Sequence, residues 1–279
     1  MAASPSRSSA GIARRLALAA IFALARVARA DTLADADAAY KAGRYAEAVG
    51  LAQSALKAQE TAAGYIILGK ALMRTDKLDA SLKAFQSALE LEPKAQGAHF
   101  FRGTIFAKQG RKADAEKELA LEVAVTPNSA QTHCQLGILR HDLGKPSPAA
   151  QSLARCVELD PRNQAALKLL LATYVELKRP NDATLLLEKL PKDDADLPSF
   201  AYNVALIFYG KNQDAKAASA LRTALAAKPD MASAHYLLGL TLARQDKDDE
   251  AKTELKAYLD AEPSGEHAAD ARKALDTLK

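Results

Sequence analysis

The chain has 279 residues, and its 38 Lys and Arg against 34 Asp and Glu give a formal charge of +4. Residues 1–30 hold five arginines and no Asp, Glu or Lys, so 33 basic residues face 34 acidic ones in the rest of the chain. This balance excludes a broadly basic surface of the kind that binds nucleic acid or anionic membranes. Ala, Leu, Lys and Glu dominate the composition, which favours helices.

Residues 1–30 have the pattern of an export signal. Arginines up to Arg15 precede an apolar run from Leu16 to Ala25, and small residues at 28 and 30 precede Asp31. The run is too short for a bilayer span, which needs about 20 residues. We predict a cleaved signal peptide, export to a bacterial periplasm and no transmembrane span in the mature chain. An organelle transit peptide is the alternative, because the segment is rich in Arg and Ser.

The residues after this leader repeat with a period of 34. Small residues recur in a first amphipathic segment and large ones in a second, with a turn between them and a proline after them. The small column is Gly69, Gly103, Gly137, Ala205 and Gly239. The large column is Phe85, Leu119, Leu153, Leu187, Leu221 and Leu255, and the prolines are Pro93, Pro127, Pro161, Pro229 and Pro263. We expect the small column to face small residues of the second helix, and the large column to fill the space towards the neighbouring pair.

This pattern resembles the tetratricopeptide repeat (TPR) family over nearly all of the chain after the leader. The resemblance implies an all-α, right-handed α-solenoid of about seven helix-turn-helix repeats over residues 31–279, closed by a capping helix. The expected repeats are 29–61, 62–95, 96–129, 130–163, 164–197, 198–231 and 232–265, with the capping helix at 266–279.

Two of these blocks depart from the pattern. Block 29–61 is one residue short, and block 164–197 has Leu171 where the other repeats have a small residue. Pro191 should also end the second helix of this block early, and residues 192–196 read as a solvated loop. We therefore predict a hinge or a change of curvature near residue 191.

Cys134 and Cys156 are the two cysteines, and they fall in the two helices of one repeat. In an oxidising compartment they could form a disulfide. Buried cysteines are more often small apolar fillers, and we favour that interpretation.

The sequence points to no metal site, cofactor or catalytic centre. His99, His133 and His235 occupy one repeat column, too far apart to share a metal, so we expect structural roles for them. A site built from His133, His141 and the two cysteines lacks the usual ligand spacing. The sequence contains no G-x-S-x-G, phosphate-binding glycine loop or H-E-x-x-H motif, so we predict a protein that is not an enzyme.

In the TPR family the concave surface is built mainly by the first helix of each pair. Carried along the repeat, this resemblance places apolar residues such as Ile138, Leu206 and Leu240 on that surface. The anchors that we predict are Phe100, Tyr202, Tyr209 and Tyr236, with Lys70, Arg74, Lys108 and Arg244 supplying charge. The alternative is that the tyrosines fill a narrow interior. The Lys and Asn pair with which chaperone-binding members hold a carboxylate is absent at the matching positions.

We therefore expect a non-catalytic scaffold or adaptor that binds a peptide or helix of a partner protein on its concave face. The alternative is a structural subunit of a cell-envelope or secretion assembly that uses its convex face or its ends. Neither function involves nucleic acid.

Overall fold

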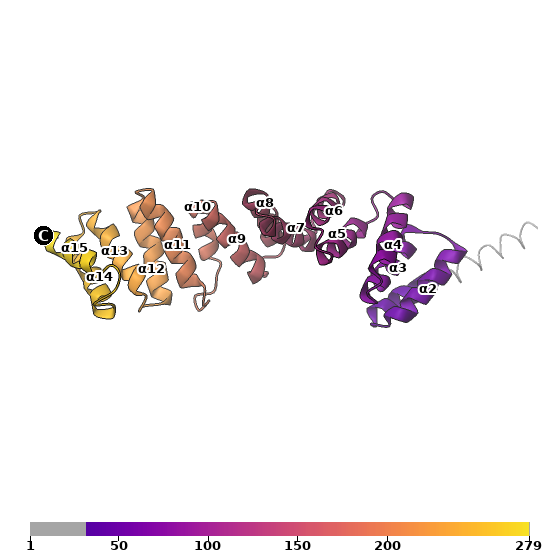
Figure 1. Ribbon diagram of the computed structural model, residues 1–279, viewed down its shortest axis with the longest axis horizontal. Coiled ribbons are helices and arrows are strands. Elements are labelled where there is room, and N and C mark those ends of the chain that lie inside the picture. Colours follow the sequence, from indigo (N-terminus) through magenta and orange to yellow (C-terminus); the bar gives the residue numbers. More distant parts are fainter. Residues whose placement is uncertain (1–31, 279) are drawn as a thin grey trace, which may run out of the picture. The chain divides into compact units, whose positions relative to one another are not determined.

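The computed structural model describes residues 32–278, and all regular structure in this range is helical (Figure 1). The chain divides into two compact units, with the boundary between Asn128 and Ser129. The predicted signal peptide and its cleavage point lie outside the described residues.

Within each unit the helices form consecutive pairs, as the 34-residue period predicts. Unit 1 contains a helix at 32–41 paired with α2 (Tyr45–Ala58), α3 (Ala62–Arg74) with α4 (Leu78–Leu91), and α5 (Ala98–Lys108) with α6 (Lys112–Val125). Unit 2 contains α7 (Ala130–Asp142) with α8 (Pro146–Leu159), α9 (Gln164–Glu176) with α10 (Pro180–Leu187), α11 (Leu197–Gly210) with α12 (Asp214–Ala227), α13 (Ala232–Ala243) with α14 (Asp248–Ala261), and finally α15 (Ala268–Thr277). The last helix packs on α14 through the buried Ala271, as expected of a cap.

The turn inside each pair is set by one residue with a left-handed backbone. These residues are Gly43, Asp76, Gly110, Gly144, Lys178, Asn212 and Asp246, with φ between 52° and 78°. Gly, Asn and Asp tolerate this conformation, whereas Lys178 adopts it at a cost in free energy. The turn lets the second helix of each pair fold back against the first.

The two helices of a pair approach most closely at the small column. A Cβ added to Gly239 would lie 2.6 Å from Leu255 Cγ, and one added to Gly69 would lie 2.7 Å from the Phe85 ring. The large column therefore packs over the glycines of its own pair. It also reaches the neighbouring pair, as expected, since the Phe85 ring stacks on Phe101 of α5 with 5.4 Å between ring centroids. The small residues of the second helix also lie near, since Ser81 Oγ donates a hydrogen bond to the Gly69 carbonyl at 2.6 Å.

The second helix of the 164–197 block is short, as Pro191 predicts. Helix α10 has 8 residues, whereas α8 and α12 each have 14. The loop that follows is fixed at both ends, because Leu190 and Leu197 are buried. The side chain of Lys168 also lies 2.8 Å from both Asp194 and Asp196, and these carboxylates raise the pKa of Lys168. The boundary between the two compact units lies at residues 128–129. The hinge or change of curvature near residue 191 stays a prediction.

Cys134 on α7 and Cys156 on α8 form a disulfide, so our preference for unpaired cysteines was wrong. The small residues that bring the two helices together also bring the two Cα atoms to 5.0 Å, within the range that a disulfide needs. The bond closes a segment with a sequence separation of 22 residues in the first pair of unit 2.

The glycine contact predicts a specific loss of stability. We expect Gly239→Ala to lower the free energy of unfolding by about 1–3 kcal/mol, because its methyl group overlaps the fully buried Leu255. The matched control is Gly50→Ala in α2, where no atom lies within 4 Å of the added Cβ. This control should raise stability by roughly 0.5–1 kcal/mol, since alanine is the better helix former. Urea unfolding of both variants is the measurement, and equal effects would contradict this packing.

Candidate functional site

The first helices of unit 2 present a column of apolar side chains. Equivalent positions of α7, α9, α11 and α13 hold Ile138, Ala172, Leu206 and Leu240, and α9 contacts both α7 and α11. We call these four residues the first-helix strip. Ile138 is 45% exposed and Leu206 is 41% exposed, which is unusual for large aliphatic side chains on otherwise well-packed helices. The sequence placed these residues on the concave surface but did not single them out as anchors.

The three predicted tyrosine anchors are half-buried and bind neighbouring parts of unit 2. Burial raises the pKa of the Tyr202 hydroxyl, and a hydrogen bond with Ser233 opposes this rise. The Tyr236 ring stacks on His267, with 4.5 Å between ring centroids and 5° between planes. Each tyrosine therefore contributes to packing between repeats, which agrees with the alternative interpretation that they fill an interior.

The Tyr209 ring is covered by the guanidinium group of Arg244, whose central carbon lies 4.1 Å from the ring centroid. Arg244 also lies 2.6 Å from Asp214 Oδ1 and donates a hydrogen bond to Asn212 Oδ1 at 2.8 Å. Its charge is therefore neutralised by the preceding repeat, and its donors are engaged there.

The predicted cations of unit 1 make the same kind of contact. Lys108 forms an ion pair with Asp76, the left-handed turn residue of the preceding pair, at 2.6 Å. The Lys70 ammonium lies 4.5 Å from the centroid of the Tyr40 ring, and the Arg74 guanidinium lies 4.9 Å from that of a second tyrosine, Tyr45. These side chains join one repeat to the one before it.

Phe100 is not the accessible anchor that we predicted, because only 7% of it is exposed. Its ring packs edge-on against Phe101 with 5.2 Å between centroids. The buried Glu122 carboxylate accepts hydrogen bonds from the backbone N–H groups of Gly97 and Phe100. This contact draws the start of α5 onto α6 and buries the ring.

Two histidines of the repeat column have a structural role, as expected. His99 Nδ1 lies 2.7 Å from Glu118, and His235 Nδ1 lies 2.6 Å from Glu254. Each pair links the first helix to the second helix of one repeat. The cysteines are joined to each other, and no group of three His, Cys, Asp or Glu residues within 32–278 could hold a metal ion.

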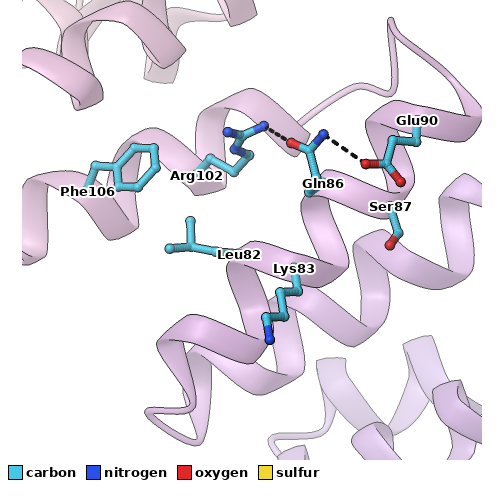
Figure 2. A pocket seen from close by; sticks show the side chains of 7 residues that line it. All are labelled: Leu82, Lys83, Gln86, Ser87, Glu90, Arg102 and Phe106. Atoms are coloured by element: carbon cyan, nitrogen blue, oxygen red, sulfur yellow. Dashed lines mark hydrogen bonds between the residues drawn. The ribbon is translucent and has the colours of Figure 1, made fainter.

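A shallow depression of about 510 Å³ lies between α4 and α5 in unit 1 (Figure 2). The figure shows Arg102 reaching Gln86, which in turn donates to Glu90. Arg102 also forms an ion pair with Glu118 at 3.0 Å. The polar side chains that line the depression thus largely bind one another.

Among the helices of residues 32–278, none has both the length and the apolar character that a membrane span requires.

Solved structures with similar folds include a Naa15/Naa10 complex bound to HypK-THB. This structure matches with a TM-score of 0.66 and 18% identity, over 88% of this chain and 38% of that chain. A tetratricopeptide repeat protein from Parabacteroides merdae matches with a TM-score of 0.50 and 15% identity, over 89% of this chain and 97% of that one. At these identities the likeness shows the fold alone.

A relative by sequence is the human protein O-mannosyl-transferase TMTC3. It is 23% identical over an alignment of 227 residues, and the match covers 67% of this chain and 25% of that protein. The chain therefore spans about a quarter of the length of this relative.

Sequence models of the tetratricopeptide repeat match most of the described residues. One model matches residues 33–79, 68–130 and 202–266, and a second matches residues 141–206. Together with the helix pairs and their 34-residue period, these matches establish that the chain belongs to the tetratricopeptide repeat family.

Proposed function

We propose that this protein is a non-catalytic scaffold that binds a segment of a partner protein on the first-helix strip of unit 2. The observation that carries the proposal is the exposure of Ile138 and Leu206 at equivalent positions of two first helices. Apolar side chains gathered on an exposed surface mark interaction sites. The structurally similar Naa15/Naa10 complex bound to HypK-THB shows a related fold within a protein assembly, which supports this class of function.

The strip itself carries no charge, and the cations near it are already engaged. Arg244 is held by Asp214, and Lys168 is held by Asp194 and Asp196. An apolar partner segment therefore suits this surface better than an acidic one. The half-buried Tyr202 and Tyr209 would add contact area at a low cost in side-chain entropy.

A non-catalytic role is supported by the contacts of the ionisable side chains, which serve the packing of the helices. The buried Glu118 and Glu122 serve ion pairs and backbone hydrogen bonds inside unit 1, and His235 serves an interhelical contact. The enzyme name of the human relative does not carry over, since the chain covers a quarter of that protein.

We further propose that the protein is exported by its predicted signal peptide and works in the bacterial periplasm. The Cys134–Cys156 disulfide supports this location, because structural disulfides persist in oxidising compartments.

The disulfide gives a test of location and stability. Protein recovered from the periplasm should take up a thiol-alkylating reagent only after reduction and unfolding. Replacing both cysteines by alanine should lower the free energy of unfolding of unit 2 by about 3 kcal/mol, given the 22-residue separation. Reducing agent should destabilise the wild type and leave this variant unchanged. Alkylation of the unreduced protein would contradict the proposal.

The binding proposal predicts where a partner contacts the chain. A photo-crosslinking residue at position 138 or 206 should form one discrete adduct in cells, because both side chains are exposed on the strip. The same residue in place of Gln151, an exposed side chain on the second helix α8, should not form this adduct. Once the adduct is identified by mass spectrometry, the purified partner should bind the Ile138→Ser, Leu206→Ser double variant about tenfold more weakly. Unchanged binding at unchanged helicity would refute the role of the strip.

A further inference from the structure

A second surface of unit 2 has the composition of a binding site, and it lies between the second helices α10 and α12. This outer groove has a volume of about 440 Å³. Leu185, Leu187, Phe208 and Ala220 provide its apolar lining. The sides of the groove come from the second helices, its floor includes Phe208 of the first helix α11, and it shares no residue with the first-helix strip.

Leu185 is an exposed apolar residue at a repeat position that is polar in five other repeats. Its side chain is 61% exposed, the highest value among the exposed large hydrophobic residues of the described chain. The equivalent positions of five other repeats are polar: Lys83, Lys117, Gln151, Ser219 and Thr253. The position therefore requires no apolar side chain for packing, and the leucine has no structural reason to be there.

Glu188 lies at the end of the same groove without a partner. It is exposed and it caps the carboxyl end of the short helix α10, where its backbone N–H donates to the Leu186 carbonyl. Its side chain makes no hydrogen bond or ion pair with residues 32–278. The carboxyl end of a helix carries partial negative charge, so an acidic side chain there is unfavourable unless a cation approaches it.

In the neighbouring pair of second helices, the position equivalent to Glu188 forms an ion pair between the two helices. Arg222 on α12 and Glu250 on α14 form an ion pair at 2.8 Å that joins the two helices. The equivalent residues in the outer groove are Glu188 and Lys216, which also have opposite charges. Lys216 instead donates a hydrogen bond to Asn181 at 2.8 Å, and its ammonium lies 5.5 Å from the centroid of the Phe208 ring.

We propose that the outer groove binds a partner segment in which an aliphatic or aromatic side chain is followed closely by Lys or Arg. The apolar side chain lies on Leu185 and the floor formed by Phe208 and Ala220. The basic side chain pairs with Glu188 and neutralises the end of α10. The complementarity is thus apolar along the groove and electrostatic at one end, which selects a basic segment over an acidic one.

The experiment uses the full chain and three short synthetic peptides of the same Ala and Gln background. One peptide carries Leu and Lys, the second has Glu in place of Lys, and the third has Ala in place of Leu. In titrations followed by NMR, the Leu and Lys peptide should shift the amide signals of residues 181–188 and 216–223. It should bind about tenfold more tightly than either of the other two.

Two variants at exposed positions separate recognition from folding. Leu185→Ser, which installs the residue found at the equivalent position 219, should weaken the Leu and Lys peptide about tenfold. Glu188→Lys should reverse the preference in favour of the Glu peptide. The matched control Leu91→Ser removes an exposed leucine from α4 in unit 1, outside both proposed surfaces, and should leave peptide binding unchanged.

Three outcomes would overturn the proposal. The first is equal binding to the wild type and to Leu185→Ser when both have the same thermal stability. The second is the absence of shifts in the groove with the Leu and Lys peptide. The third is self-association of the wild type that Leu185→Ser abolishes, since a second copy of this chain would then be the occupant. None of these outcomes affects the first-helix strip.

Discussion

The close contact between a glycine of the first helix and a large side chain of the second sets the geometry of the repeats. Gly69, Gly103, Gly137 and Gly239 have no Cβ, so a phenylalanine or leucine of the second helix lies directly over their backbone. The large residue is thereby buried between its own pair and the next helix, and Phe85, Leu153 and Leu255 are fully enclosed. Ile138 and Leu206 directly follow the small residues Gly137 and Ala205, so they lie about 100° around the helix from this contact. There they stand exposed.

The sequence was sufficient to predict the helix pairs, the terminal cap and the early end of α10, because these features depend on periodicity and proline. It was insufficient where the outcome depends on the packing of particular side chains. The contact of the large column with the glycines of its own pair was not predicted, since a small column alone does not say which residue covers it. The Cys134–Cys156 disulfide required the distance between two helices, and the division at residues 128–129 has no signal comparable to Pro191.

Several residues that we predicted to bind a partner instead make contacts within the protein, for a related reason. Long cationic side chains such as Lys108 and Arg244 reach back to the turn of the preceding repeat, where Asp76 and Asn212 adopt left-handed backbones. The sequence shows that these cations lie on the first helix but not that acceptors lie within their reach. Exposed aliphatic residues have no such partners, so Ile138 and Leu206 remain available although they are less conspicuous in the sequence than tyrosine or arginine.

Unit 2 thus has two surfaces that differ in chemistry and in origin. The first-helix strip depends on α9 and α11, which keep their full lengths of 13 and 14 residues. The outer groove lies beside α10, whose early end before Pro191 places Glu188 at a helix terminus. The loop that replaces the rest of α10 is held to α9 by Lys168 and to the core by Leu190 and Leu197, so the shortening does not propagate into the first helices. A change confined to one second helix can therefore create a second binding surface while the first-helix strip keeps its geometry.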